Sequence, residues 1–357
     1  MLEGVRASGQ LEIAMIKGSD PVIWVLEGQK AGDNAQACEL ATRVGGHIEI
    51  RKLRYRSWLN EARNFLLGAS LITLDRQSSD ELSPPWPDLV IGVGRRCVPV
   101  ARWIRQQSGG RARLVQLGRP RARLDLFDLV ITTPQYGLPL APNVIELALP
   151  FTPRTTSVKT EKWQNELANL PEPRIAVLVG GPMKRLRMGP PEIDRLAGGA
   201  AALAQQLGGS LVVIAAPRTP AGLVESMAPM LTVPHRIFPW KAGESNPYRA
   251  ALQIAARFIV TSDSVSMLAE ALVTGKPVDV FRLPYRKPYR LPLRRWPFRW
   301  LVRKGLLATK RNVDGFIDQL IAGGHLGVLG GEERWRKSPS GADDQAVARV
   351  KGLLADE

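Results

Sequence analysis

Strands and helices alternate along most of this chain, and that alternation limits its fold more than any other feature of the sequence. Apolar runs such as PVIWVLEG and PDLVIGVG end in glycine and are followed by segments with helical periodicity, CELATRVGG and ARWIRQQSGG. Such repeats form βαβ units with a mostly parallel sheet, and ligands of these sheets bind beyond the carboxyl ends of the strands. We therefore expect an α/β fold with its site at that edge.

The strand and helix series occurs twice. The first covers residues 20–150, and the second begins at RIAVLVGGP and covers residues 174–320. Between them, residues 151–173 are polar and contain three prolines, which is typical of a linker. Residues 1–19 form an N-terminal extension and residues 321–357 a C-terminal tail. A chain of 357 residues exceeds the size at which one core stops growing, so the sequence predicts two tandem Rossmann-like domains with an interdomain cleft.

The charge balance predicts an anionic partner. The 49 Lys and Arg residues outnumber the 33 Asp and Glu residues, giving a net charge of +16, which favours phosphorylated substrates, acidic membranes or nucleic acid. Cys38 and Cys97 are the only cysteines, so no disulfide framework is possible and both fit free buried thiols in a reducing compartment. No apolar run approaches the roughly 18 to 20 residues of a membrane span, and we expect a cytoplasmic protein, soluble or peripheral on a membrane.

The segment TSDSVSMLAEALVTGKPV, residues 261–278, has the composition of a ligand-binding loop. It follows the apolar run RFIV and places hydroxyls and backbone N–H groups at the start of a helix, where anions are favoured. Glu270 lies one to two turns inside that helix, where its carboxylate would accept both hydroxyls of a ribose. An ordinary capped helix fits the pattern equally well, since Ser and Asp are common N-cap residues. The candidate loop residues are Thr261, Ser262, Asp263, Ser264, Ser266 and Met267.

Two more loops should meet this segment at the same sheet edge. One contains Gly180, Gly181 and Lys184, and the other contains Arg218. Glycine lets a backbone approach a diphosphate closely, and an arginine offers a planar, multi-donor cation for phosphate oxygens. The three loops predict a donor pocket for phosphate and ribose, although the charge of Lys184 fits a solvated loop equally well.

The first domain would present the loop GQKAGDNAQ to the other side of the cleft. Asp33 is the candidate general base, since an acceptor hydroxyl must lose its proton as it attacks an anomeric carbon. Asp33 would equally serve as the cap of a helix beginning at Asn34. Arg95, after the run DLVIGVG, fits either an anionic acceptor site or a basic surface turn. The other expected acceptor-site residues are Gly28, Lys30, Gly32 and Asn34.

Several enzyme classes lack their motifs in this chain. It has no Asp-x-Asp pair and only three isolated histidines, so no metal site is indicated. It also lacks the Gly-x-x-x-x-Gly-Lys-Ser/Thr and Gly-x-Gly-x-x-Gly phosphate-binding turns. We expect no cofactor, and a nucleotide sugar as a substrate that loops and basic side chains hold.

The segment FRLPYRKPYRLPLRRWPFRWLVRKG, residues 281–305, is basic and aromatic and contains no acid. Its prolines exclude one continuous helix. Basic residues gain about 1 kcal/mol each near anionic lipid, and Trp and Tyr favour the headgroup region. We favour an anionic membrane surface over single-stranded nucleic acid, since no nucleic-acid-binding module is visible, while packing under the cleft is the structural alternative. The expected membrane residues are Arg294, Arg295, Trp296, Arg299 and Trp300.

The motifs WVLEGQKAGDNAQ, DLVIGVGRR, RIAVLVGGP, AAPRTP and the run ending in GKPV resemble, in order and spacing, the mitochondrial-fission-protein-like family. The resemblance spans about residues 21–320 and implies a GT-B glycosyltransferase-like fold, which does not fix an activity. More loosely, the run SxSMxxEAxxxGKPV is similar to the donor motif of GT-B enzymes that build the bacterial cell envelope. That similarity implies Glu270 for the ribose and Ser264 with Ser266 for the diphosphate. The Gly32–Asp33 pair is similar to the first loop of lipopolysaccharide heptosyltransferases, where an aspartate is taken as the base.

Residues and resemblance together predict an inverting, metal-independent glycosyltransferase on the cytoplasmic face of a bacterial inner membrane. It would move a sugar from a nucleotide diphosphate to a lipid-linked or lipopolysaccharide-core acceptor. Two alternatives stay open: a non-catalytic protein of the same fold that binds membrane or partner proteins, and a sugar-nucleotide epimerase. Binding of a nucleotide sugar separates the non-catalytic alternative from the enzymes.

Overall fold

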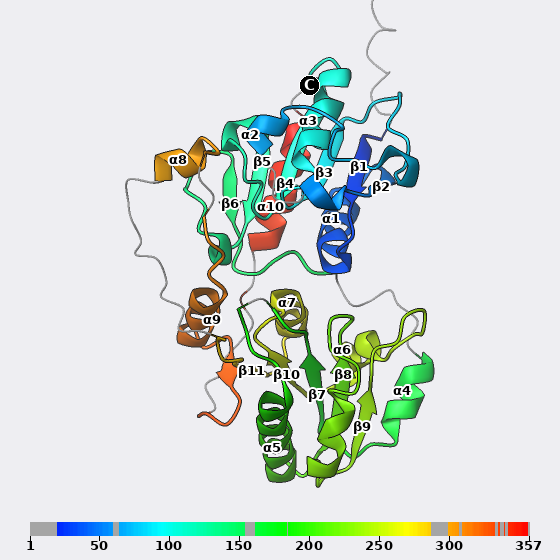
Figure 1. Ribbon diagram of the computed structural model, residues 1–357, viewed down its shortest axis with the longest axis vertical. Coiled ribbons are helices and arrows are strands. Elements are labelled where there is room, and N and C mark those ends of the chain that lie inside the picture. The colour runs from blue at the N-terminus through cyan, green and yellow to red at the C-terminus, as the bar shows by residue number, and fades with distance from the viewer. Residues whose placement is uncertain are drawn as a thin grey trace, which may run out of the picture.

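Two parallel sheets form the framework of the molecule (Figure 1). The computed structural model describes residues 20–59, 64–153, 161–183, 185–286, 299–306, 309–332, 335, 339 and 342–355. Within these residues each sheet has six strands, all paired in parallel. The predicted α/β fold with two Rossmann-like domains is therefore confirmed.

The first sheet has the strand order β2-β1-β3-β4-β5-β6. Its strands are β1 Val22–Glu27, β2 His47–Lys52, β3 Leu89–Val93, β4 Arg113–Leu117, β5 Leu129–Thr132 and β6 Val144–Glu146, and its helices are α1 Ala31–Val44, α2 Asn64–Leu67 and α3 Val98–Gln107. The strands β1, β3, β4 and β5 are neighbours, so the loops at their carboxyl ends lie along one edge.

The second sheet has the strand order β12-β11-β10-β7-β8-β9. Its strands are β7 Arg174–Val179, β8 Ser210–Ala215, β9 His235–Phe238, β10 Arg257–Thr261, β11 Val278–Phe281 and β12 Gly327–Val328. The helices from here to the C-terminus are α4 Glu161–Ala168, α5 Pro190–Gln206, α6 Tyr248–Ile254, α7 Val265–Val273, α8 Arg299–Arg303, α9 Val313–Ala322 and α10 Ala342–Ala355.

The central strands are apolar on both faces, because helices cover both sides of each sheet. In β1, Ile23 and Val25 belong to one buried cluster, while Trp24 and Leu26 belong to the cluster on the opposite face. Successive strand residues point to opposite faces, so a strand covered on both sides appears in the sequence as an uninterrupted apolar run. This is why the runs that suggested strands were continuous rather than alternating.

The C-terminal part of the chain returns to the first domain. Helix α10, red in Figure 1, buries Ala346 and Val350 against the first sheet. Arg43 of α1 forms an ion pair with Asp344 of α10. Val302 of α8 joins the buried cluster on the other face of the same sheet. The segment after β11 therefore crosses between the domains more than once.

The two domains also meet through short contacts. The backbone N–H of Asn312, just before α9, donates to the carbonyl of Gln135 at 2.7 Å. At the start of α1, a Cβ atom added to Gly32 would lie 3.4 Å from Ser266 Oγ in the first turn of α7. The N-terminal ends of α1 and α7 thus face each other across the domain junction (Figure 1).

None of the helices in the described ranges is both long and apolar enough to span a bilayer.

Candidate functional site

Three loops converge at the carboxyl edge of the second sheet, as the sequence predicted. The strands β10, β7 and β8 are adjacent, so the loops that follow them meet. The N–H of Gly180 donates to Thr261 Oγ1 at 2.8 Å, and that of Gly181 donates to Asp263 Oδ2 at 2.8 Å. Arg218 Nη2 lies 3.3 Å from the same Asp263 oxygen. These bonds join the loops after all three strands.

The Asp263 carboxylate is the centre of this loop arrangement. Its residue is 3% exposed, and its second oxygen, Oδ1, accepts a hydrogen bond from Thr261 Oγ1 at 2.7 Å. Burial raises the pKa of Asp263, while the bonds from Thr261 and Gly181 and the charge of Arg218 lower it. Both oxygens are bonded to the protein, so the Asp263 side chain holds the loops in position.

Both glycines of this edge are required by close approach of the loops to one another. A Cβ atom added to Gly180 would lie 2.1 Å from Asp263 Oδ2, and one added to Gly181 would lie 2.1 Å from the carbonyl oxygen of Arg218. No side chain fits at such distances without displacing a loop. The sequence analysis attributed these glycines to the approach of a diphosphate, whereas the structure shows contact within the protein.

Hydroxyl groups complete the loop arrangement. Thr219 Oγ1 donates to the carbonyl of Val179 at 2.9 Å and accepts from the N–H of Ala216 at 2.9 Å. Ser262 Oγ accepts a hydrogen bond from the N–H of Leu283 at 3.0 Å. Thr219 was not among the predicted site residues, although it lies beside Arg218 in the same loop.

The N-terminus of α7 offers donors to an anion. Ser264 is the N-cap residue, but its side chain makes no capping hydrogen bond. The first N–H groups of a helix have no partner within the helix, and together with the helix dipole they favour negative charge. Ser266 and Met267 of this first turn are partly exposed, and Ser266 lies where the two domains meet.

Glu270 lies one turn further along α7, in a mostly buried position. Its side chain is 11% exposed, and Arg249 Nη1 lies 3.2 Å from its Oε2. Burial raises the pKa of Glu270, while Arg249 and the nearby Tyr248 lower it. Glu270 Oε2 and Tyr248 Oη are both buried, and neither makes a hydrogen bond of good geometry in the described structure. The buried Oε2 thus faces protein groups, and only the exposed part of the Glu270 side chain is open to a ligand.

Asp33 lies in the first turn of α1, on the first domain's side of the junction. The helix begins at Ala31, so Asp33 does not cap a helix that begins at Asn34. Its side chain is 38% exposed, and Lys30 Nζ lies 3.6 Å from Asp33 Oδ2. Asn34 closes the preceding loop, because its amide accepts from the N–H of Gly28 at 2.9 Å and donates to the carbonyl of Gly28 at 3.0 Å.

The side chains of Asn64 and Arg96 join the loops of the first sheet. Asn64 Nδ2 donates to the carbonyl of Arg95 at 2.9 Å and to that of Pro120 at 2.7 Å. Arg96 Nη1 donates to Gln29 Oε1 at 2.8 Å, which connects the loop after β3 to the loop after β1. Asn64 is 3% exposed, and no sequence signal distinguished it from other polar residues.

Some predicted residues cannot be placed. Lys184, Arg294, Arg295 and Trp296 lie outside the described residues, and of Arg299 only its position at the start of α8 is described. Trp300 of α8 is 60% exposed.

No group of three or more His, Cys, Asp or Glu residues that could hold a metal ion occurs in the described part of the chain.

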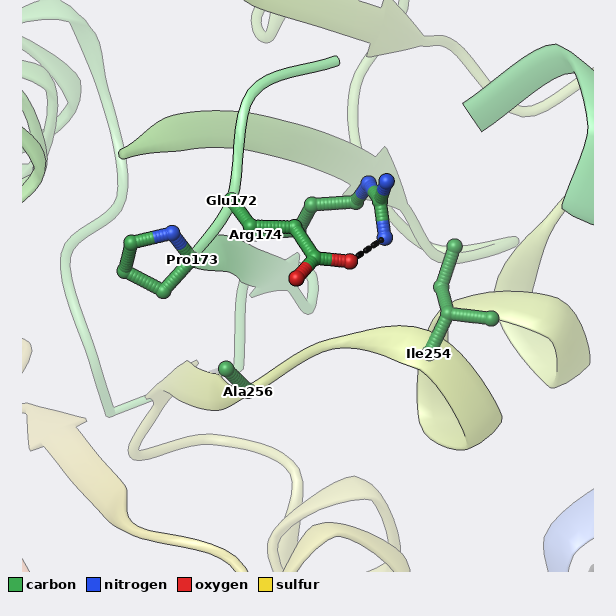
Figure 2. Close-up of a pocket in the computed structure, with 5 residues that line it drawn as sticks. All are labelled: Glu172, Pro173, Arg174, Ile254 and Ala256. Carbon is green, nitrogen blue, oxygen red and sulfur yellow. Dashed lines mark hydrogen bonds and ion pairs between the residues drawn. The ribbon is translucent and has the colours of Figure 1, made fainter. Parts of the chain in front are cut away.

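A hollow also exists at the opposite edge of the second sheet (Figure 2). Its lining residues are Glu172, Pro173, Arg174, Ile254 and Ala256. Arg174 begins β7 and Ala256 precedes β10, so this hollow lies at the amino ends of the strands. Arg174 Nη1 donates to Glu172 Oε1 at 2.8 Å, and this ion pair occupies one wall. The loops described above are at the other end of the same strands.

Comparison with known sequences identifies related proteins. The family model described as mitochondrial fission ELM1 matches residues 31–293. The mitochondrial fission protein ELM1 of Arabidopsis thaliana is 30% identical over 320 residues, which cover 80% of this chain and 67% of that protein. An uncharacterized protein of Rickettsia prowazekii is 30% identical over 110 residues, which cover 30% of each chain.

Comparison with solved structures identifies the fold. A UDP-glucosyltransferase from Polygonum tinctorium matches with a TM-score of 0.50 and 11% identity, over 95% of this chain and 99% of that one. The UDP-GlcNAc 2-epimerase from Methanocaldococcus jannaschii matches with a TM-score of 0.49 and 9% identity, over 94% and 100%. With its two Rossmann-like domains, the chain has the GT-B glycosyltransferase-like fold.

Proposed function

The chain belongs to the mitochondrial fission ELM1 family, and from that premise and the loop geometry we propose that it binds a nucleoside-diphosphate sugar at the carboxyl edge of its second sheet. The observation that carries the proposal is the position of the Glu270 carboxylate, 11% exposed and one turn inside a helix whose N-terminus is not capped by Ser264. A carboxylate and a helix N-terminus at this spacing suit a ribose and a diphosphate.

Each part of the ligand has a proposed binding group. Glu270 would accept hydrogen bonds from the ribose hydroxyls. The first-turn N–H groups of α7, with the hydroxyls of Ser264 and Ser266, would hold the diphosphate. Arg218, whose side chain is 54% exposed, would add a positive charge beside the phosphates. UDP is the first nucleotide to test, because the solved glucosyltransferase of the same fold uses a UDP-linked donor.

We further propose that the bound sugar is transferred with inversion. An acceptor oxygen would attack the anomeric carbon on the face opposite the diphosphate, the bond to the diphosphate would break, and its electron pair would leave with that group. Asp33 would take the proton of the acceptor hydroxyl. A lipid-linked or lipopolysaccharide-core acceptor would lie against the loop that includes Gly28, Lys30, Gly32 and Asn34, with Arg95 nearby.

A second function, binding without transfer, is favoured by one observation. Lys30 Nζ lies 3.6 Å from the Asp33 carboxylate, so this carboxylate already has a partner within its own loop. In this case the protein would bind membrane or partner proteins without transferring a sugar, and Asp33 would only close the loop.

We also propose that the basic aromatic segment contacts anionic lipid at the inner membrane. Support comes from α8, where Trp300 is exposed while Val302 is buried against the first domain. Trp300→Ser should reduce sedimentation with vesicles of phosphatidylglycerol and phosphatidylcholine, and leave the melting temperature unchanged. Equal sedimentation of the two proteins would limit α8 to a structural role.

Donor binding is tested by the melting temperature of the protein with a panel of nucleoside diphosphates and nucleotide sugars. A ligand at 100 times its dissociation constant stabilises the folded state by about 2.7 kcal/mol. We expect a shift for one base and a smaller one for the others. A flat panel would remove the basis of the proposal.

A further inference from the structure

Four arginines meet at the carboxyl edge of the first sheet, where the proposed function has assigned only one of them. Arg119 and Arg121 follow β4, Arg95 follows β3, and Arg311 precedes α9. We call these four residues the arginine cluster. The guanidinium carbons of Arg119 and Arg311 lie 5.9 Å and 5.8 Å from the ring centre of Tyr136. One aromatic ring therefore has two cations within contact distance.

The charge of Arg119 has no acidic partner in the described structure. Its Nη1 atom is buried and makes no hydrogen bond there. Burial, together with the charges of Arg121, Arg311 and Arg95, lowers the pKa of Arg119 to about 10, while Tyr136 acts in the opposite direction. Like charges held together at a partly buried position cost free energy unless an anion joins them.

Elsewhere in the same domain, partly buried arginines are neutralised. Arg105 forms an ion pair with Asp128, and Arg51 forms one with Glu49. The only hydrogen bond described for the Arg311 side chain goes from Nε to Gln135 Oε1, at 2.5 Å, and Gln135 is neutral. Arg119 and Arg311 thus differ from the domain's ordinary structural arginines.

The position of the cluster is fixed by the protein. Asn64 bonds to the carbonyls of Arg95 and Pro120, which ties together the loops after β3 and β4. Arg121 has a φ of 52°, in the left-handed region that residues other than glycine seldom adopt. Arg311 reaches the cluster from the other domain's side of the junction, where Asn312 bonds to Gln135. These contacts fix the loops that contain the cluster.

We propose that the arginine cluster binds a diphosphate group, and that this group belongs to the acceptor. The assignment to an acceptor rests on the proposed function, in which the second sheet holds the donor. A planar guanidinium binds two phosphate oxygens at once, and several together suit a group with more than one negative charge. The acceptor would then be a diphosphate-linked sugar or lipid. The hydrogen bond from Arg96 to Gln29 connects the loop of Arg95 to the loop before Asp33, so such an acceptor would lie close to the proposed base.

The test is calorimetric titration of inorganic pyrophosphate into the full-length protein and its Arg119→Gln, Arg76→Gln and Arg218→Gln variants. We expect Arg119→Gln to weaken pyrophosphate binding at least tenfold and Arg76→Gln, at an exposed arginine of the same domain, to leave it unchanged. Equal affinity in Arg119→Gln and the parent protein would overturn the proposal. Loss of binding in Arg218→Gln alone would also overturn it, since pyrophosphate would then occupy the second sheet's edge.

The Arg119→Lys variant and the melting temperature of Arg119→Gln separate a loss of binding from a loss of folding. Arg119→Lys retains the charge but loses the planar fork, so its affinity for pyrophosphate should fall between those of the parent protein and Arg119→Gln. The melting temperature of Arg119→Gln should not fall, because the change removes a repelled cation; if it does fall, Arg119→Lys decides the test.

A parallel titration with UDP separates this inference from the proposed function. If UDP does not bind but Arg119→Gln still loses pyrophosphate, the donor proposal fails and the diphosphate site stands. If Arg218→Gln weakens UDP binding while Arg119→Gln leaves the affinity for pyrophosphate unchanged, the donor proposal stands and this inference fails. Loss of UDP in Arg119→Gln would assign the cluster to the donor's own diphosphate and overturn the acceptor assignment.

Discussion

The carboxyl edges of the two sheets are built from the same kind of loop but are joined in different ways. At the second sheet a carboxylate joins them: Asp263 accepts from Thr261 and from the N–H of Gly181, and lies beside Arg218. At the first sheet a neutral amide does so, since Asn64 donates to two loop carbonyls. The difference decides how much positive charge each edge has left for a ligand.

Gln116 extends this contrast within the first domain. Its Nε2 donates to the carbonyl of Gly94 at 2.7 Å, so a second neutral amide holds the loop that precedes Arg95. A carboxylate in place of either amide would put a negative charge close to the arginines, as Asp263 does beside Arg218. We infer that the second edge recognises its ligand through backbone groups and Glu270, and the first edge through charge.

The substitution with the largest expected effect is at the first edge, where Asp33 is the proposed base. Asp33→Asn removes the proposed base, and loss of a general base lowers turnover by about 10²- to 10⁴-fold. Binding of UDP, which belongs to the other edge, should be unchanged. The measurement is turnover of a nucleotide sugar with an acceptor extract, alongside a UDP titration.

Asp20→Asn is the matched control for that change, because Asp20 is an exposed aspartate of the same domain. It should behave like the parent protein. Full turnover in Asp33→Asn would show that another group takes the proton or that the protein does not transfer sugar through this residue.

Loop contact at the second edge is tested by Gly181→Ala. The added Cβ atom would meet the Arg218 carbonyl at 2.1 Å, so the loop must shift, and overpacking of this kind costs about 1–3 kcal/mol. Urea unfolding measures the loss, and UDP binding should weaken with it.

Gly198→Ala serves as its control, because Gly198 lies in α5 with no atom within 4 Å of an added Cβ. Alanine should stabilise that helix by about 0.5–1 kcal/mol. A Gly181→Ala protein as stable as the parent would mean that the loops can move apart freely.

Glu270→Gln should weaken UDP binding by about tenfold, or roughly 1.4 kcal/mol, because a hydrogen bond to a charged group is lost. Stability should change little, since the amide avoids the burial cost that raises the pKa of Glu270. Calorimetry measures the affinity. An unchanged affinity would remove Glu270 from the site.

The smallest effect is on pH dependence. Burial raises the pKa of Glu270 above its ordinary 4.5. Between pH 4.5 and the raised pKa, Glu270 therefore keeps its proton in the folded protein but loses it in the unfolded chain. The stability that Glu270 contributes is therefore complete below pH 4.5 and is lost as the pH rises through its raised pKa. Urea unfolding from pH 4.5 upward should show a smaller decline in Glu270→Gln, with Asp263 as the remaining contributor. An equal decline of the unfolding free energy with pH in Glu270→Gln and the parent protein would show that Glu270 is not the source of this pH dependence.

The sequence alone predicted the elements whose pattern depends only on residues close together in the chain. Continuous apolar runs predicted β1, β3, β7 and β10, because buried parallel strands leave no polar face. The edge strands β6, β9 and β12 were missed, since each has two to four residues and carries no clear pattern. The meeting of the loops after β7, β8 and β10 followed from the strand order typical of such sheets.

Features made by distant parts of the chain could not be predicted. Residues 95, 119 and 311 meet only because the topology brings three separate loops together, and nothing local marks them as a group. The same holds for α10, whose apolar residues do not specify which sheet they cover. Asn64 and Asp263 look alike in sequence, as polar residues near a helix start. Asn64 nevertheless joins its loops through a neutral amide, whereas Asp263 does so through a carboxylate.

The two edges should hold two ligands at once, and sequential calorimetry checks this. The protein is first saturated with UDP and then titrated with pyrophosphate. We expect pyrophosphate still to bind the UDP-saturated protein, and Arg119→Gln to weaken this binding. Disappearance of the pyrophosphate signal after UDP saturation would mean one shared site and would contradict the division of ligands between the two sheets.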